Sequence, residues 1–565
     1  MIVTISDLIN QLNSVVGNRF VITSPYSMER FCKGYRSGGG KAIAVVCPGT
    51  LLEQWRVLEL CVAANVIVIM QAANTGLTEG SAPSGVYDRD VIVLSTNRMS
   101  KIQIIQNGKQ IIAFPGATLY ALEEKLKPLN RKPHSVIGSS CVGASIIGGV
   151  CNNSGGALIE RGPSYTELSL TAKVNQDGVL ELINHLGINL GNDPETILTR
   201  LEAGDFKEND FEYTESIASD KEYQNRVRDI DSETPARFNA DPTRLYEASG
   251  CAGKLSVFAV RVDTYPKNEK EKVFYIGVKN PNALTNLRRD MLSTFSTLPV
   301  SAEYMHSECY DISKKFGKDT LILIDKLGTE RLPKLFSIKG WLDARLNSSK
   351  WFPANFIDRI MQVVGTTWKN VLPKRMEEFR NRFDHHLILK MRDGGIDEAR
   401  RYIKDKFDGV NSDCFECGVR EAEIASLHRF VAAGAAVRYM AINKGAVADI
   451  IALDIALKRN ERNWFEKLPA SIERAISHKL YYGHFFCHVF HQDYVVKKGH
   501  DPVKVKEQLL AFIQGRGAKY PAEHNVGNIY KADQELANFY KKCDPTNSFN
   551  PGIGKMNKSK HYSAI

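Results

Sequence analysis

Histidine and carboxylate side chains that could bind a metal or move a proton gather near the end of the chain. Five of the 13 His residues of this 565-residue sequence lie between positions 484 and 524. A pair of such His residues with a Glu is a reasonable ligand set for a divalent metal, because imidazole suits borderline metals and the carboxylate offsets their charge. The alternative for this set is a structural role. A histidine also has an unperturbed pKa near 6.5, which suits a base that acts around neutrality.

Two loops rich in small residues could hold phosphate groups. The first is residues 71–81, and the second, residues 133–156, carries six Gly from Gly138 onward. Small side chains let successive backbone N–H groups approach an anion and form a concavity around it. Two such loops indicate a dinucleotide with two phosphates. Neither loop has the GxGxxG motif after a strand, and residues 38–41 lack the P-loop spacing, so the sequence argues against nicotinamide-fold and NTPase functions.

Alternating strands and helices must position these loops. Short apolar runs at 42–46, 66–70 and 91–95 predict strands, and residues 51–64 predict a helix between the first two. Further strands are predicted at 110–114, 168–174, 254–262 and 273–278, and further helices at 118–126 and 281–298. Charges crowd residues 205–247 without a persistent period, which predicts a long surface excursion. The pattern favours a mixed sheet with helices.

Length and composition limit the class of protein. A hydrophobic core stops growing at roughly 250–300 residues, so two or three domains are expected. Hydrophobic residues make up 43% of the chain, which is typical of a globular protein. The net charge is +10, which is compatible with an anionic partner surface. The 11 Cys include one CxxC, Cys414 and Cys417, and fit a reducing compartment. The sequence predicts neither a signal peptide nor a bilayer-spanning helix.

A basic, aromatic segment lies at residues 326–382. It holds 12 Lys or Arg against 5 Asp or Glu, a local net charge of +7, together with Trp341, Trp351 and Trp368. This mixture suits the interface of an anionic membrane, where each basic residue near the surface contributes about 1 kcal/mol. The same composition could bind nucleic acid, or it could form a solvated helical face with its aromatic residues in the core.

The order and spacing of the loops resemble those of a known family. Residues 71–81 and 133–156, with Pro115 and Gly116 between them and residues 249–257 beyond, resemble the FAD-binding domain of the vanillyl-alcohol-oxidase type. Residues 544–552 are similar to the C-terminal segment with which these enzymes close the flavin domain, so the resemblance covers virtually the whole chain. It implies an α+β fold, in which this FAD-binding domain carries an α/β cap domain and a basic membrane-attachment segment.

The resemblance also implies which residues contact FAD. Family members that attach FAD covalently often use a His in the first loop, and residues 71–81 contain none, so noncovalent FAD is implied. The alternative is that the glycines of both loops only make turns. The implied FAD-binding residues are Ala72, Ala73, Asn74, Thr75, Gly76, Gly80, Ser81, Gly138, Ser145, Gly155 and Val257.

Within this family the chain looks most like bacterial members that oxidise D-lactate and reduce quinone. His484 and His491 are similar in spacing to two metal-binding His of related 2-hydroxyacid dehydrogenases, Glu523 resembles their third ligand, and His524 resembles the catalytic base. The chain departs from this pattern at residues 485–487, where Phe, Phe and Cys replace small and acidic residues, so the divalent metal stays an open alternative. Arg429 or Arg438 could bind the substrate carboxylate through a bidentate contact.

The resemblance implies the following organisation and function. We expect a FAD-binding domain at 1–265, a cap domain at 266–325 and 383–514, the membrane-binding segment at 326–382, and a C-terminal completion of the FAD domain at 515–565. The expected partners are D-lactate, quinone and anionic membrane lipid, with no nucleic acid, at the cytoplasmic face of the bacterial inner membrane. The alternatives are oxidation of another 2-hydroxy acid, such as glycolate or D-2-hydroxyglutarate, and a noncatalytic flavin-binding membrane protein.

Overall fold

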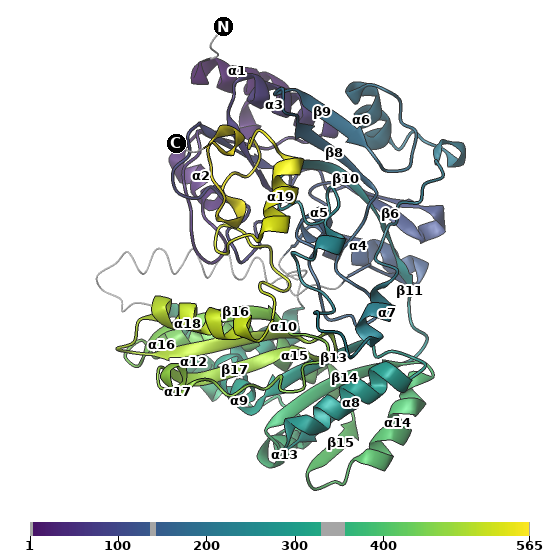
Figure 1. The fold of residues 1–565 in the computed structure, drawn as a ribbon, viewed down its shortest axis with the longest axis vertical. Helices are drawn as coiled ribbons and strands as arrows, with labels where there is room; N and C mark the ends of the chain where they lie inside the picture. Colours follow the sequence, from purple (N-terminus) through teal and green to yellow (C-terminus); the bar gives the residue numbers. More distant parts are fainter. Residues whose placement is uncertain (1–3, 136–142, 329–355, 564–565) are drawn as a thin grey trace.

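The fold begins with a small parallel sheet, because buried apolar strands alternate with amphipathic helices. The computed structural model describes residues 4–135, 143–328 and 356–563 (Figure 1). The strands follow the order β1-β2-β4-β3, with β2, β4 and β3 parallel to one another. Helices α1 and α3 pack on one face of this sheet and α2 on the other. The bounds are α1 (Ile5–Val16), β1 (Val21–Ile22), α2 (Pro25–Cys32), β2 (Ala44–Val46), α3 (Leu51–Ala63), β3 (Ile67–Gln71) and β4 (Val91–Ser95).

A five-stranded antiparallel sheet follows, in the order β5-β6-β10-β8-β9. Side chains of a strand point alternately to its two faces. On β6, Ile111 and Ala113 therefore pack against α4 and α5, whereas Ile112 packs into the core shared with the first sheet. The bounds are β5 (Ile102–Ile105), β6 (Gln110–Ala113), α4 (Leu119–Leu126), β7 (Arg131–Lys132), α5 (Ile146–Cys151), β8 (Ser169–Val174), β9 (Leu180–Asn184), α6 (Pro194–Ala203), β10 (Ser256–Asp263) and β11 (Tyr265–Pro266).

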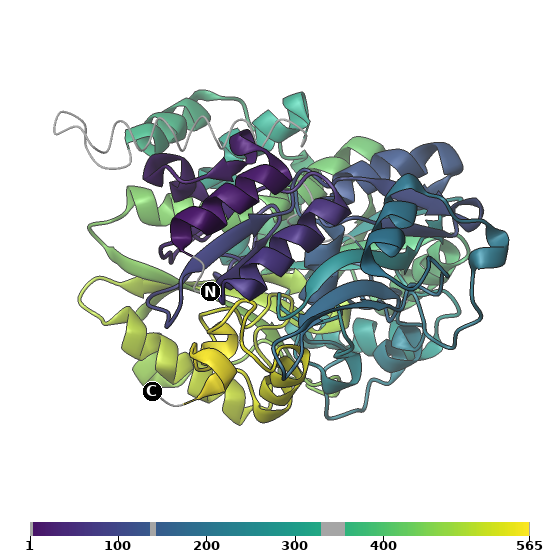
Figure 2. The ribbon, with the colours of Figure 1, turned by 90° about the horizontal axis from the view of Figure 1, so that it is seen from above.

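The end of the chain returns to the first sheet. After α19 (Gln534–Cys543), the backbone runs beside β3, where the Val68 N–H donates to the Ser548 carbonyl at 3.0 Å and the Asn550 N–H donates to the Val68 carbonyl at 3.1 Å. The buried Lys254 ammonium lies 3.8 Å from the buried Asp544 carboxylate and donates to the Asn547 side chain at 2.7 Å. Figures 1 and 2 both show α19 and its neighbouring loops against the N-terminal part of the molecule.

The cap is a seven-stranded sheet in the order β15-β12-β14-β13-β17-β18-β16, with every neighbouring pair antiparallel. Helices α8, α14, α17 and α18 cover one face, and α9, α10, α13, α15 and α16 cover the other. The bounds are β12 (Glu271–Val278), α8 (Pro281–Thr294), β13 (Ser301–His306), α9 (Ser307–Phe316), α10 (Lys318–Leu327), α12 (Phe356–Thr367), α13 (Lys374–Arg382), β14 (His385–Arg392), α14 (Gly395–Lys406), β15 (Ser412–Glu416), α15 (Val419–Phe430), α16 (Ala432–Ile442), β16 (Val447–Ala456), α17 (Ala470–Glu473), β17 (Ile476–His484), β18 (Val489–Lys497) and α18 (Pro502–Gly515).

The prediction of a surface excursion at residues 205–247 was only partly right, because most of these residues are exposed or half-exposed but several are buried. This segment contains α7 (Tyr223–Arg228), and its Tyr223, Val227 and Ala236 are buried in the core of the cap. The many charged residues suggested full exposure, but several of them form ion pairs with one another inside the segment. Asp220, for example, accepts from Arg226 and Arg244 at 2.8 Å. The segment therefore bridges the two halves of the molecule.

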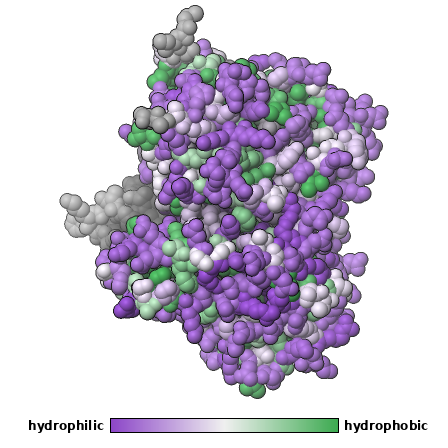
Figure 3. All heavy atoms as spheres, viewed as in Figure 1, coloured by the Kyte–Doolittle hydropathy of each residue, from purple (hydrophilic) through white to green (hydrophobic). Residues whose placement is uncertain are grey.

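The face of the molecule in Figure 3 is mostly hydrophilic, with small scattered apolar patches.

Candidate active site

One large cavity lies between the two glycine-rich loops and the cap sheet. Its volume is about 2160 Å³, whereas a pocket for a single ligand usually measures roughly 300–1,000 Å³. The cavity therefore has room for a large cofactor together with a substrate. Each predicted site residue that the structure describes lines this cavity, and Gly138 falls outside the described residues.

The first loop, residues 71–81, begins at the last residue of strand β3, and side chains tie its two ends together. The Gln71 amide donates to the Phe31 carbonyl at 2.9 Å and to the Ser81 carbonyl at 2.6 Å. The Ser81 hydroxyl in turn donates to the Asn74 side chain at 2.8 Å. A Cβ added at Gly76 would meet nothing within 4 Å. The loop thus presents its backbone to the cavity without a side chain filling the space, as a cradle for a phosphate group requires.

The second loop reaches the cavity on both sides of α5. Ser145 caps this helix by accepting from the Gly148 N–H at 3.0 Å. Further along, Gly155 touches the histidine and carboxylate cluster, because a Cβ there would come within 2.6 Å of a Glu523 carboxylate oxygen. Val257 on β10 is buried and lines the cavity between the two loops. Gly155 therefore links the cofactor side of the cavity to its catalytic side.

The sheet register brings four titratable residues onto one face of the cap sheet, in a diagonal row that we call the histidine row. Glu303 on β13 lies opposite His484 on β17, and Asp454 on β16 lies opposite His491 on β18. Strands β17 and β18 are neighbours joined by a tight turn. His484 and His491 therefore share one face of the hairpin, with a carboxylate outside each imidazole. The Glu303 oxygen lies 2.6 Å from His484 Nδ1, and the Asp454 oxygen lies 3.7 Å from His491 Nδ1.

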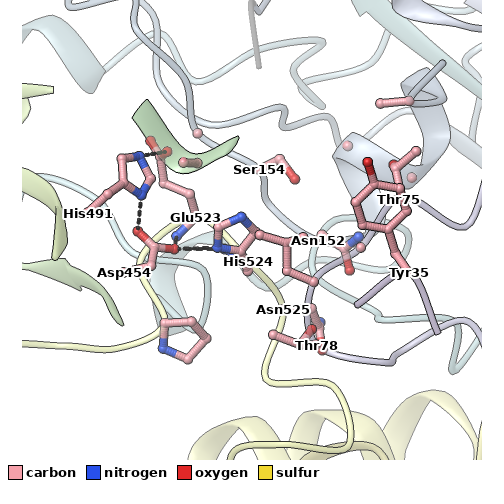
Figure 4. Close-up of a pocket in the computed structure, with 18 of the residues that line it drawn as sticks. Tyr35, Thr75, Thr78, Asn152, Ser154, Asp454, His491, Glu523, His524 and Asn525 are labelled. Atoms are coloured by element: carbon pink, nitrogen blue, oxygen red, sulfur yellow. Dashed lines mark hydrogen bonds and ion pairs between the residues drawn. The ribbon is translucent and has the colours of Figure 1, made fainter. Parts of the chain in front are cut away.

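Glu523 and His524 approach this row from the segment that leads back to the first sheet. A Glu523 oxygen lies 3.2 Å from His484 Nε2 and 3.7 Å from His491 Nε2. His524 Nδ1 lies 2.8 Å from the second oxygen of Asp454. In Figure 4, Asp454 stands between His491 and His524, and Asn152, Thr75 and Tyr35 lie on the other side of His524.

Burial and nearby charges give His484, His491 and His524 different pKa values. Burial alone would lower the pKa of His484, but Glu303 and Glu523 outweigh it and raise this pKa to about 10. At His491 burial dominates over Asp454 and Glu523, and the pKa falls to about 4. At His524 the Asp454 carboxylate outweighs burial and raises the pKa above its ordinary value. The cluster thus holds one cationic and one neutral imidazole at neutral pH, which are His484 and His491.

The donor set fits a divalent metal. One ligand atom from each of His484, His491 and Glu523 lies within 4.8 Å of the other two. Metal-binding histidines usually donate their second N–H to a carboxylate, which fixes the ring orientation, and Glu303 and Asp454 occupy these positions. The replaced residues 485–487 are buried in the core of the cap, so they do not displace the donor atoms.

Charge balance allows two states of this donor set. The cluster contains the carboxylates of Glu303, Asp454 and Glu523, whereas Arg237 and Arg429 supply two positive charges at 2.5 Å and 3.0 Å from their partners Glu523 and Glu303. One negative charge is left over. A proton on His484 balances it, and a bound divalent cation more than balances it.

The two predicted arginines lie in different surroundings. Arg429 on α15 pairs with Glu303, next to the histidine row, and its guanidinium lies 4.6 Å from the Tyr482 ring centroid. Arg438 on α16 is buried between Asp319 at 3.1 Å and Asp358 at 2.9 Å, among the cap helices. The structure therefore brings Arg429 to the cluster, whereas Arg438 serves an ion-pair network at the far end of the cavity.

Sequence reasoning missed several residues of the cluster. Glu303 and Asp454 come from strands far from the histidine motifs, and only the strand register reveals them. Arg237 lies in the segment predicted as a surface excursion, yet it is 2% exposed. Arg36, exposed on the loop after α2, also lines the cavity, and its charge acts to lower the pKa of His524 and of Asp493. The sequence held one signal for Arg36, because residues 33–41 contain basic residues but no acidic residue that could pair with them.

Comparison with known proteins decides the family. The model named "FAD binding domain" matches residues 42–170, and the model named "D-lactate dehydrogenase, membrane binding" matches residues 273–562. The chain is 54% identical to the quinone-dependent D-lactate dehydrogenase of Escherichia coli K12 over 558 residues, which cover 99% of this chain and 98% of that protein. The chain belongs to the quinone-dependent D-lactate dehydrogenase family.

Other relatives agree with this assignment. Proteins with the same name from Haemophilus influenzae and Corynebacterium glutamicum are 52% and 42% identical, over 99% of this chain and 100% and 98% of their own lengths. The FAD-binding match spans both glycine-rich loops, and it confirms FAD as the predicted cofactor. Membership of the D-lactate dehydrogenase family confirms the predicted enzyme class.

Solved structures support the fold. A p-cresol methylhydroxylase with substrate bound has a TM-score of 0.58 at 11% identity, covering 99% of this chain and 98% of that one. A 4-ethylphenol oxidase from Gulosibacter chungangensis has a TM-score of 0.57 at 12% identity, covering 97% and 96%. At these identities the likeness concerns the fold alone. It confirms the predicted α+β class with a FAD-binding domain of the vanillyl-alcohol-oxidase type.

Proposed function

We propose that this chain oxidises D-lactate to pyruvate with FAD and delivers the electrons to quinone at a membrane surface. The observation that carries the proposal is the Asp454–His524 pair, which lies in the same cavity as the loops that bind FAD. When bound, FAD accepts the hydride from C2 of the substrate and hands its electrons on. The names of the relatives supply the substrate and the acceptor.

His524 acts as the base that takes the proton of the substrate hydroxyl. Asp454 holds Nδ1 and thereby fixes the ring orientation and tautomer, so Nε2 is the nitrogen left to act on the substrate. Asp454 also raises the pKa of His524, which makes the imidazole a stronger base. A positioned base of this kind typically contributes roughly 10²- to 10⁴-fold to the rate.

Arg429 is the better placed of the two predicted arginines to bind the substrate carboxylate. It lies beside the histidine row, whereas Arg438 is already held by two carboxylates at 2.9 Å and 3.1 Å. Arg36 adds a second positive charge to the cavity near His524. Together these cations would hold an anionic substrate with its hydroxyl toward His524.

Substrate choice tests the proposal. The purified holoenzyme would be mixed anaerobically with D-lactate, L-lactate, glycolate or D-2-hydroxyglutarate while the flavin absorbance is followed. We expect D-lactate to bleach the flavin fastest. Failure of D-lactate to bleach it would reject the proposal, and faster bleaching by glycolate or D-2-hydroxyglutarate would favour another 2-hydroxyacid dehydrogenase.

We expect FAD to be bound noncovalently. The first loop, residues 71–81, offers no His for attachment, and its backbone lines the cavity as an open cradle. Acid precipitation should therefore release all the flavin into the supernatant. Yellow colour that stays in the washed pellet would contradict this expectation.

We propose that His484, His491 and Glu523 bind a divalent metal in the active state. A bound cation would take the place of the proton on His484 and leave the site more positive toward an anionic substrate. Prolonged dialysis against a chelator should abolish flavin reduction by D-lactate, and added Zn²⁺ or Mn²⁺ should restore it. Full activity after dialysis, with no metal detected by mass spectrometry, would favour the protonated, structural state of the cluster.

We propose that residues 326–382 attach the protein to anionic lipid on the cytoplasmic face of the membrane. Within the described part of the chain, no helix is long and apolar enough to cross a bilayer. The segment is strongly basic, and its Trp368 is 37% exposed. Trp341 and Trp351 fall outside the described residues.

Charge reversal tests the electrostatic part of this attachment. Lys369→Glu with Lys374→Glu should weaken sedimentation with anionic vesicles by an order of magnitude or more, because each basic residue contributes about 1 kcal/mol near such a surface. The matched control is Lys541→Glu with Lys542→Glu on α19, where binding should persist. Wild-type binding should also fall as salt rises. Equal binding to neutral vesicles at every salt concentration would contradict the proposal.

A further inference from the structure

The cavity continues past the histidine row into a part that the oxidation of a small hydroxy acid does not use. Beyond Arg429 it runs between helices α10, α12, α15 and α16 on one side of the cap. We name this part the helical arm of the cavity. Its lining residues include Thr320, Leu323, Met361, Phe430, Gly434 and Val437.

The helical arm is open and mainly apolar. Phe430 and Val437 are large apolar residues, yet they are 39% and 46% exposed. A Cβ added at Gly434 would meet nothing within 4 Å, so the space beside α16 is free of described atoms. The nearby guanidinium of Arg438 is held by Asp319 and Asp358. These surroundings suit an apolar ligand and give a small anion such as lactate little to bind.

The arm borders the most apolar exposed surface of the cap helices. Helix α12, which lines the arm through Met361, exposes Ile360, Val363 and Val364 by 44%, 63% and 39%. Adjacent exposed apolar residues of this kind mark a surface that another apolar phase covers. Because α12 lies in the basic segment and in the region matched by the membrane-binding family model, that phase is the lipid bilayer.

We propose that the helical arm is the binding site for the membrane quinone. The inference rests on the proposed function. A quinone with an isoprenoid tail is dissolved in the bilayer, so it needs an apolar path from the lipid to the cofactor. The arm provides this path in one continuous cavity, with its outer part beside α12 and its inner part open to the FAD-binding loops.

The redox step balances without any further reactant. The quinone takes up two electrons and two protons and becomes a quinol. The electrons come from the reduced cofactor, which returns to its oxidised form, and the protons come from the reduced cofactor and from solvent. The helical arm and the histidine row are different parts of one cavity, so the proposal lets the tail stay in the arm while the hydroxy acid exchanges at the histidine row.

Bulky substitutions in the arm test this site. Gly434→Trp and Val437→Trp fill the arm from α16, and Val419→Trp, at the exposed start of α15 and outside the cavity lining, is the matched control. Each holoenzyme is reduced with dithionite and mixed anaerobically with a short-chain ubiquinone, and flavin re-oxidation is followed. Equilibrium binding of the same ubiquinone to the oxidised holoenzyme is measured by titration calorimetry.

We expect re-oxidation by ubiquinone to slow, and ubiquinone binding to weaken, by about tenfold or more in both arm variants and to stay near wild-type in the control. Anaerobic reduction of the flavin by D-lactate should stay within about twofold of wild-type in all three variants. If Gly434→Trp fails to fold, the half-exposed position 437 keeps the test decisive through Val437→Trp and Val437→Asp.

Normal ubiquinone binding and re-oxidation in folded, FAD-loaded arm variants would overturn the proposal. Because dithionite replaces D-lactate as the reductant, this result is independent of the proposed substrate. If wild-type flavin were re-oxidised by ubiquinone but not reduced by D-lactate, the proposed function would fail while the assignment of the arm stood.

Discussion

His524→Ala is expected to slow the reduction of the flavin by D-lactate by roughly 10²- to 10⁴-fold, the usual contribution of a positioned general base. The hydroxyl proton must leave as the hydride departs, and His524 is the imidazole that Asp454 orients at 2.8 Å. FAD content should not change, because His524 lies outside both loops that are predicted to bind FAD. Single-turnover absorbance measurements under anaerobic conditions isolate this step from quinone reduction.

Two further variants sharpen the test of His524. His500→Ala removes an exposed histidine between β18 and α18 and should leave the rate unchanged. Asp454→Asn keeps the shape of the side chain but removes the charge that raises the pKa of His524, so it should also slow the reaction. Near-normal flavin reduction by His524→Ala, or loss of FAD from this variant, would show that His524 is not the base.

Lys254→Met is expected to lower the free energy of unfolding by about 3–5 kcal/mol, the usual cost of removing one partner of a buried ion pair. Lys254 and Asp544 both have side chains with 0% exposure. Without the ammonium, the Asp544 carboxylate stays buried with only the backbone N–H groups of Ser548 and Phe549 and one hydroxyl to stabilise it. Urea unfolding followed by circular dichroism and by the fluorescence of released flavin measures the loss.

The control for Lys254 is another lysine of the FAD side. Lys542→Met on α19 changes an exposed residue and should alter stability by no more than about 0.5 kcal/mol. The double variant Lys254→Met with Asp544→Asn should recover part of the loss, because it removes the unpaired charge. Wild-type stability in Lys254→Met would mean that the pair contributes nothing to the fold.

The local parts of the fold followed from sequence patterns. Buried strands such as Val91–Ser95 and the helix Leu51–Ala63 have apolar periods within one segment, so a short window predicted them to within a residue or two. Residues 205–247 were predicted only in part, because the burial of a few of them depends on partners elsewhere. Tyr223 and Val227 pack against the cap, which begins later in the chain, and no local period records such a contact.

In the candidate site, too, short motifs predicted some residues, whereas others depend on long-range strand pairing. The two glycine-rich loops and the neighbours Glu523 and His524 are short motifs, so they could be chosen before the fold was known. The residues that tune them could not be chosen. Asp454 matters because strand β16 pairs with β18 in the register that sets it opposite His491, and a shift of one residue would turn its side chain to the other face. Long-range register is not encoded in any single segment.

The return of the chain end to β3 sets the order in which a newly made molecule can assemble. The Met70 N–H of β3 donates to the Asn550 side chain, 480 residues later. At roughly 5–20 residues per second of synthesis, the ribosome needs on the order of half a minute to a minute and a half to cover that distance. The antiparallel cap sheet has all its strands by Lys497 and can form while translation continues. The FAD-binding domain must wait until residues 544–550 have been made, so cofactor loading is a late step and a nascent chain cut short before Asp544 leaves an incomplete domain.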